Sequence, residues 1–119
     1  MNKKDVISEL RETDGEIFEY DGDIASIHAV LEGETHVEIC LFVVRKDERL
    51  NGYGSIVFES LLQVLREHNI NSATVKIQAL DDGSPEDPIM NFLSNYNFEY
   101  QGSFKHYNWD LCIKAHGYF

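Results

Sequence analysis

The chain has few of the features that mark membrane-spanning, disulfide-bonded or metal-binding proteins. It has only two prolines and two cysteines in 119 residues, and no apolar run approaches the 18 residues of a membrane-spanning helix. Cys40 and Cys112 stand 72 residues apart, which matches no metal or redox spacing. The five histidines show no ligand spacing either. We therefore expect no metal site and two reduced thiols.

Basic residues are also scarce, with 10 Lys and Arg against 21 Asp and Glu and a net charge of −11. Residues 1–40 carry −8 and residues 81–119 carry −4, whereas residues 41–80 carry +1. An acidic chain repels nucleic acid and attracts cations. We therefore expect no nucleic-acid or membrane partner, and cationic partners such as amines. The alternative is that the acidic surface only keeps the protein soluble.

The composition is that of one globular domain. Hydrophobic residues make up 43 % and aromatic residues 12 %, which is enough for one core. No repeat, linker or composition break divides the chain, so we predict a single domain over residues 1–119. Residues 1–5 lead into an acidic helix rather than an apolar one. This favours the absence of a signal peptide and a cytoplasmic location.

The first 44 residues read as a short helix followed by an antiparallel meander. The apolar spacing predicts a helix over residues 5–11 and strands over 16–20, 23–31 and 35–44. Asp21 and Gly22 form a two-residue hairpin signal. The third strand has apolar residues on both faces, with Glu38, Cys40, Phe42 and Val44 sharing one of them. We therefore expect a central strand that is covered on both sides.

The rest of the chain adds a crossover and two closing strands. We predict a polar loop over residues 45–54, a helix over 55–68 and a half-buried strand over 73–79. An acidic loop then leads to a helix that starts at Pro88, and to strands over 98–104 and 107–113. A strand, a helix and a strand in this order indicate a parallel connection. The predicted fold is α+β (mixed α/β), with a mostly antiparallel central sheet, one parallel strand pair and flanking helices.

The segment between the third strand and the second helix carries the motif Arg49-x-x-Gly52-x-Gly54. Glycines allow positive φ and close backbone approach, and a helix start offers unpaired N–H groups and a positive dipole end. Together these suit a pyrophosphate, bound by the N–H groups of residues 52–55. The alternative is a solvated basic turn with tight glycines. Dinucleotide and P-loop motifs fit badly, because the third glycine and the Gly-Lys-Ser/Thr run are missing.

This segment resembles the acyl-CoA pyrophosphate loop of the GNAT superfamily of N-acetyltransferases. The order of elements agrees over residues 16–113. The similarity is closest to the histone acetyltransferase branch, where a glutamate precedes the first glycine by fourteen residues, as Glu38 precedes Gly52. The resemblance implies a GNAT-like fold whose parallel strands are splayed, acetyl-CoA as co-substrate, and N-acetyltransferase activity.

The resemblance also implies which residues contact acetyl-CoA. The strand before the loop pairs with the pantetheine arm, and the loop holds the pyrophosphate. The residues so implied are Leu41, Phe42, Val43, Val44, Arg49, Leu50, Asn51, Gly52, Tyr53, Gly54 and Ser55.

Glu38 is the candidate general base. An attacking amine must first lose a proton, and apolar neighbours such as Phe42 and Val44 would disfavour the ionised form of a carboxylate. A general base works best when its pKa lies near the working pH. We expect Glu38 to take the proton through a water. The alternative is a glutamate that faces solvent or pairs with a neighbouring base.

The chain departs from the family at the second helix and at its start. Leu93 and Glu86 occupy the positions where many members have a tyrosine acid and an asparagine. Tyr96 is the substitute candidate for the acid, and a core aromatic is its alternative role. Only about fifteen residues precede the meander. We therefore expect an acceptor site that is open, or completed by a second subunit in a homodimer, or lost.

The leading hypothesis is an N-acetyltransferase whose acceptor is a lysine side chain, a protein N-terminus or a polyamine. The alternative is a non-catalytic acyl-CoA-binding or protein-interaction module of the same fold. A third reading, an acidic mimic of nucleic acid, does not need the Arg49-x-x-Gly52-x-Gly54 motif. The acidic loop over residues 81–87 is either solvated or in contact with a basic substrate.

Overall fold

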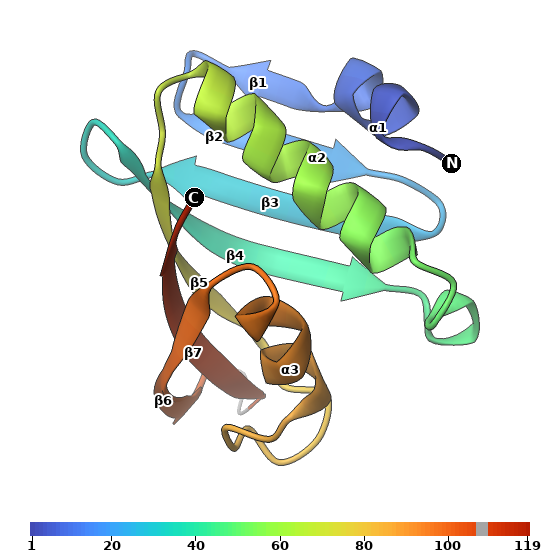
Figure 1. The fold of residues 1–119 in the computed structure, drawn as a ribbon, viewed down its shortest axis with the longest axis vertical. Coiled ribbons are helices and arrows are strands. Elements are labelled where there is room, and N and C mark those ends of the chain that lie inside the picture. Colours follow the sequence, from blue (N-terminus) through green and yellow to red (C-terminus); the bar gives the residue numbers. More distant parts are fainter. Residues whose placement is uncertain (107–109) are drawn as a thin grey trace.

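The computed structural model describes residues 1–106 and 110–119. Over these residues the sheet has seven strands in the order β1-β2-β3-β4-β5-β7-β6 (Figure 1). The elements in chain order are α1 (Lys3–Glu9), β1 (Arg11–Thr13), β2 (Ile17–Asp21), β3 (Ala25–Leu31), β4 (His36–Val44), the 3₁₀ helix η1 (Lys46–Glu48), α2 (Tyr53–Glu67), β5 (Ser72–Gln78), α3 (Pro88–Ser94), β6 (Phe98–Lys105) and β7 (Leu111–Tyr118).

One strand pair, β4 with β5, is parallel, and the other pairs of the described sheet are antiparallel. The parallel pairing covers only residues 36–39 of β4 and 72–75 of β5. Beyond these residues the two strands diverge, as Figure 1 shows. The predicted α+β fold with one splayed parallel pair is confirmed.

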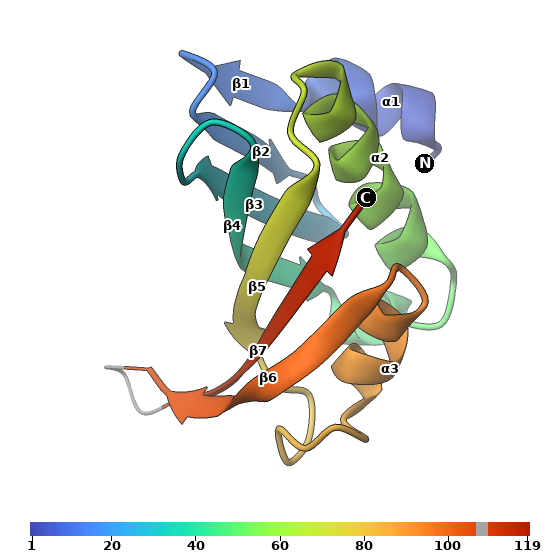
Figure 2. The same ribbon diagram turned by 60° about the vertical axis from the view of Figure 1, so that its left-hand side comes forward.

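The core lies between the sheet and the helices α2 and α3. Phe58 of α2 is fully buried, and its ring centroid lies 5.5 Å from those of Phe42 on β4 and Phe92 on α3. Both helices therefore pack on the same side of the sheet. The described helices leave the opposite side uncovered (Figure 2), and we call this side the open face. Truncation of an aromatic such as Phe58 to alanine costs about 3–5 kcal/mol.

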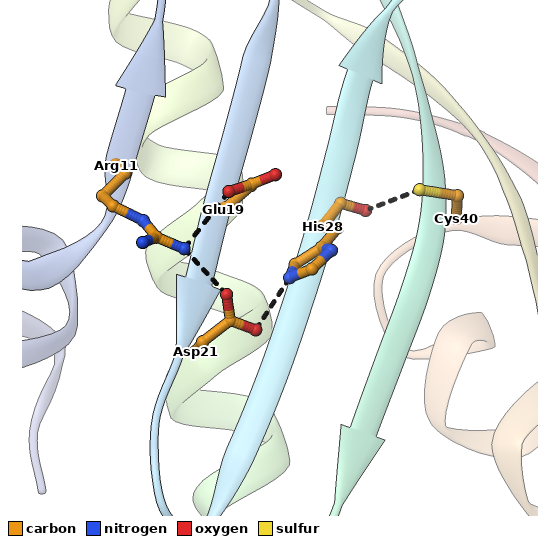
Figure 3. Close-up of polar contacts among 5 residues, drawn as sticks. All are labelled: Arg11, Glu19, Asp21, His28 and Cys40. Carbon is orange, nitrogen blue, oxygen red and sulfur yellow. Dashed lines mark hydrogen bonds and ion pairs between the residues drawn. The ribbon is translucent and has the colours of Figure 1, made fainter.

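A β-bulge in β4 decides which of its side chains reach the core. Ala29 pairs with Ile39 but His28 pairs with Leu41, so Cys40 is the extra residue, and its Sγ lies 3.7 Å from the His28 carbonyl oxygen (Figure 3). An extra residue reverses the alternation of faces. Val37 and Ile39 are buried before the bulge, and Phe42 and Val44 face the core after it.

The bulge overturns two predictions. Glu38 does not share a face with Phe42 and Val44, because it precedes the extra residue and they follow it. The strand is also not covered on both sides, since Leu41 and Val43 are 37 % and 45 % exposed on the open face. The free thiol of Cys40 is exposed, whereas that of Cys112 is buried.

Three predicted boundaries also change. The first helix lies at Lys3–Glu9, and the three-residue strand β1 that follows it was missed because it is too short to show a period. The first hairpin turns at residues 23–24 rather than at Asp21 and Gly22, because the Gly22 N–H donates to the Ala25 carbonyl. The predicted last strand began at residues 107–109, which lie outside the described residues; β7 runs from Leu111 to Tyr118.

Candidate functional site

A cavity of about 820 Å³ opens where β4 and β5 diverge. Its lining comes from β4, from the loop and first turn of α2, from the residues after β5, and from α3. The lining residues are Cys40, Leu41, Phe42, Val43, Val44, Glu48, Arg49, Leu50, Gly52, Gly54, Ser55, Gln78, Ala79, Leu80, Pro88, Ile89 and Phe92. Nine of the residues predicted to contact acetyl-CoA are among them; Asn51 and Tyr53 are not.

The cavity exposes one edge of β4. The ladder to β5 stops at Ile39, so residues 41–44 have no strand partner on that side within the described chain. On the other side they stay paired with β3. Unpaired backbone N–H and C=O groups along a strand edge bind extended ligands as an added strand would.

The loop at the end of the cavity is held in a tight conformation. Gly52 has φ 81° and precedes α2, and Leu50 has φ 70°. A Cβ at Gly52 would meet no atom within 4 Å, so this glycine is required by its backbone conformation and not by space. A Cβ at Gly54 would lie 3.5 Å from Phe42 and 3.6 Å from Phe92. The latter two distances are ordinary contacts. The start of α2, whose first N–H groups have no partner within the helix, therefore lies against the cavity.

Arg49 is the cation that the described lining supplies to the cavity. Its Nε donates a hydrogen bond to the Val44 carbonyl at 3.1 Å, which ties the loop to the end of β4. Arg45 instead binds both carboxylate oxygens of Asp47, at 3.0 and 2.6 Å. This pair lowers the pKa of Asp47 and raises the pKa of Arg45. Arg45 is therefore not free to bind a ligand, and Glu48, which also lines the cavity, opposes the charge of Arg49.

Glu38 lies outside the cavity lining, two residues before Cys40 and on the open face. Its side chain is 26 % exposed, and its Oε1 lies 2.8 Å from Lys76 Nζ. The hydrogen bond and charge of Glu38 raise the pKa of Lys76. The apolar surroundings predicted for Glu38 are wrong, and the ion-paired alternative describes its place in the structure.

Tyr96 packs under the cavity and does not line it. Its ring lies 4.9 Å from Phe58 and 5.3 Å from Phe92, and its hydroxyl donates to Glu59 Oε2 at 2.8 Å. Burial is the main reason that the pKa of Tyr96 is raised. The side chain that α3 presents to the cavity is Phe92, whereas Leu93 is fully buried.

Asp87 organises the acidic loop that borders the cavity. Its carboxylate accepts hydrogen bonds from the N–H groups of four residues, at 2.9 to 3.2 Å: Leu80, Asp81, Gly83 and Ile89. Burial opposes the ionised form, but these N–H donors prevail and lower the pKa of Asp87. Asp87 thus caps α3 and fixes the loop, so it is a structural residue and not a free contact for a basic substrate.

Several lining residues were missed from the sequence. Gln78 ends β5, Ala79 and Leu80 follow it, and Pro88, Ile89 and Phe92 belong to α3. Pro88 as a helix start and the apolar side of α3 were visible signals, but their place beside β4 depends on tertiary packing. Among residues 1–106 and 110–119, no three His, Cys, Asp or Glu side chains gather as metal ligands would. No described helix is long and apolar enough to span a membrane.

The family model for the acetyltransferase (GNAT) family matches residues 10–84, more than half of the chain. The chain therefore belongs to the GNAT acetyltransferase family. No curated protein sequence matches it.

Solved structures of acetyltransferases share the fold. The chain is similar to Ard1 from Thermoplasma volcanium, with a TM-score of 0.68 and 18 % identity over 97 % of this chain and 76 % of that chain. It is similar to the aminoglycoside 6'-N-acetyltransferase from Enterococcus faecium, with a TM-score of 0.65 and 17 % identity over 88 % and 76 %. A GNAT family acetyltransferase from Elizabethkingia anophelis, solved with acetyl-CoA bound, has a TM-score of 0.65 and 9 % identity over 98 % and 80 %.

Proposed function

We propose that this protein transfers an acetyl group from acetyl-CoA to a primary amine. The observation that carries the proposal is the cavity itself. It joins the free edge of β4 to the start of α2, and its lining is mostly apolar. Membership of the GNAT family and the fold shared with an acetyl-CoA-bound acetyltransferase support acetyl-CoA as the co-substrate.

The residues of the cavity suit the two chemically different parts of acetyl-CoA. The N–H groups of residues 52–55 and the Arg49 guanidinium suit the pyrophosphate, because they combine the helix dipole with a full positive charge. The backbone edge of residues 41–44 suits the amide groups of the pantetheine arm. Ile89 and Phe92 on α3 give that arm an apolar floor.

The transfer needs one proton acceptor. The amine nitrogen attacks the thioester carbonyl carbon, a C–N bond forms, and the C–S bond breaks with its electron pair going to the CoA thiolate. The nitrogen gives up a proton, and we propose that Glu38 takes it through a water. Glu38 precedes the bulge on the open face, where an acceptor can approach. The acceptor ammonium would replace Lys76 as the partner of this carboxylate.

We propose that Tyr96 supports the core and is not the acid. Its hydroxyl is bound to Glu59, and its ring lies outside the cavity lining. A CoA thiolate is a fairly good leaving group and departs without a side-chain acid. Phe92, which does face the cavity, has no hydroxyl.

The acceptor class follows from charge and resemblance. The net charge of −11 favours a cationic amine on a lysine side chain, a protein N-terminus or a polyamine. The spacing of Glu38 to Gly52 supports kinship with the histone acetyltransferase branch. A cytoplasmic location and a homodimer that completes the acceptor site belong to the same proposal.

The first test is a thermal-shift titration with acetyl-CoA and with CoA. A ligand at a hundred times its Kd stabilises by about 2.7 kcal/mol, which raises the Tm of a domain of this size by roughly ten degrees. We expect Gly52→Glu to abolish the shift. Gly33→Glu is the matched control, because Gly33 has φ 82° and open space like Gly52 but lies in the turn before β4. No shift in the unchanged protein would refute the acetyl-CoA site.

A non-catalytic acyl-CoA-binding module is the second candidate. The observation that favours it is α3, which presents Phe92 to the cavity and buries Leu93, so this helix offers no hydroxyl to the site. Release of free CoA thiol with a panel of amines separates the candidates. Turnover above the rate of hydrolysis supports the transferase, and a saturable thermal shift without turnover supports the module.

A further inference from the structure

A second cavity, of about 320 Å³, lies on the open face beside the first. Lys76 of β5, Lys114 of β7, Phe104 and residues 101–103 of β6 line it. Lys76 stands two residues before Gln78, which lines the first cavity. Two residues along a strand span roughly 7 Å. Lys76, the ion-pair partner of Glu38, therefore borders the second cavity and lies close along β5 to the first.

Two lysine ammonium groups line the second cavity close together. Lys76 and Lys114 are direct partners in the antiparallel pairing of β5 with β7, so their side chains share the open face. Like charges directly opposite each other destabilise a sheet. Glu38 balances Lys76, but no carboxylate of the described residues lies within ion-pair distance of Lys114. The charge at this cavity is therefore locally positive, although the net charge of the chain is −11.

The backbone that lines the same cavity is irregular. The register of β6 with β7 shifts between Tyr100 and Gly102, so Gln101 is an extra residue, and Gly102 has φ 121°. A bulge leaves its extra residue outside the ladder of hydrogen bonds. The bulge shapes the wall of the cavity, and the two ammonium groups beside it are suited to a carboxylate, because charge-assisted hydrogen bonds to a carboxylate are strong.

We propose that Lys76 and Lys114 bind a carboxylate of the acceptor, so that the acceptor is an amine with an acidic group near it. An amino acid and a peptide with an acidic first residue both have this chemistry. The inference rests on the proposed function and narrows its acceptor class. The acceptor ammonium lies beside Glu38 while its carboxylate takes the place of Glu38 at Lys76. A polyamine is excluded from this position, because it would bring further positive charge to the two lysines.

Matched acceptors test the proposal in the full chain. Acetyl transfer is measured by release of CoA thiol with an amino acid and its amide, and with peptides that begin with Glu or with Gln. We expect kcat/KM to be at least tenfold higher for the acidic member of each pair. The pair with the larger ratio of kcat/KM, acidic member over neutral member, shows whether the acceptor is a free amino acid or a peptide. Equal rates for both members of both pairs would overturn the proposal.

Variants of Lys114 test whether the preference for acidic acceptors arises at this cavity. Lys114→Gln should reduce the preference at least tenfold and leave the rate with the amides and the Tm shift with acetyl-CoA unchanged. Lys114→Glu should invert the preference. Lys105→Gln is the control, because Lys105 is an exposed lysine of β6 that lines neither cavity. A preference that survives Lys114→Glu in a folded protein would place the anion elsewhere and refute the site.

A binding measurement keeps this inference separate from the transfer reaction. Chemical-shift titrations of the CoA-loaded protein compare the same amino acid with its amide, without turnover. Tighter binding of the acid, lost in Lys114→Gln, supports the carboxylate site even if no amine is acetylated. Acetylation of amines without preferential binding of the acid would sustain the transferase and overturn the carboxylate site.

Discussion

The rings of His36 and His116 stack with their centroids 5.4 Å apart and their planes 16° from parallel. By the alternation of the strands they lie on the open face. Their strands β4 and β7 are both neighbours of β5 (Figure 2). Both ring nitrogens of His36 contact hydroxyls of β5, at 2.7 Å for Ser72 and 2.9 Å for Thr74. Burial and the neighbouring His116 lower the pKa of His36, and Glu32 acts weakly in the other direction.

The first prediction concerns stability below neutral pH. Because the folded state lowers the pKa of His36, the unfolded chain binds the proton more readily. This stability contribution is complete above the ordinary histidine pKa of about 6.5 and falls as the pH drops toward the lower folded value. Urea unfolding from pH 7.5 to 5 should show a smaller loss for His36→Gln than for the unchanged protein. An equal loss in both would contradict the assignment.

The second prediction concerns Asp87. Asp87→Asn should destabilise the protein by about 2 kcal/mol, because a neutral amide cannot accept four N–H donors as a carboxylate does. The folded state lowers the pKa of Asp87, so this contribution is present above the unfolded value and is lost as the pH falls through the folded one. The difference between variant and parent should therefore shrink in acid. Asp81→Asn, at an exposed position of the same loop, is the control.

The third prediction concerns Glu38. Glu38→Gln should slow turnover by about 100-fold or more and flatten its dependence on pH, because the proton acceptor is removed. The Tm shift with acetyl-CoA should stay, since Glu38 does not line the cavity. Glu67→Gln, at the exposed end of α2, should leave both quantities unchanged. Full turnover with an unchanged pH profile in Glu38→Gln would show that another group takes the proton.

The fourth prediction concerns Tyr96. Tyr96→Phe should keep turnover within about threefold of the parent and cost about 1 kcal/mol of stability, the usual net value of one hydrogen bond. The reason is that its hydroxyl donates to Glu59 and Tyr96 itself does not line the cavity, although the same hydroxyl also hydrogen-bonds Ser55, which does line it. The measurement pairs urea unfolding with the thiol-release assay. Turnover that falls by about 100-fold without loss of stability would instead identify Tyr96 as the acid.

A smaller network of ion pairs lies on the open face, and we assign it a structural role. Arg11 of β1 reaches Glu19 and Asp21 of β2, and Asp21 contacts His28 Nε2 at 2.8 Å (Figure 3). The hydrogen bond from His28 is the main reason that the pKa of Asp21 is lowered. Exposed ion pairs of this kind contribute less than about 1 kcal/mol. Their effect is to hold the short edge strand β1 against β2.

Local patterns were sufficient for the elements that are long and periodic. The apolar side of α2, the order of the meander and the parallel crossover follow from spacings of two and of three to four residues. The loop motif was also readable, because Gly52 has a positive φ that favours glycine. Nine of the contact residues that the resemblance to the GNAT family implied line the cavity.

The sequence by itself determined the longer strands, the helices, the glycine loop and the net charge. Only the tertiary structure decided the surroundings of Glu38, the role of Asp87 and the side chain that α3 turns to the cavity. The physical reason is that each depends on partners far along the chain. One extra residue at Cys40 reverses the faces of β4, and Lys76 reaches Glu38 only because β5 lies beside β4. Neither the bulge nor the contact between β4 and β5 can be read from the pattern of residues along the chain.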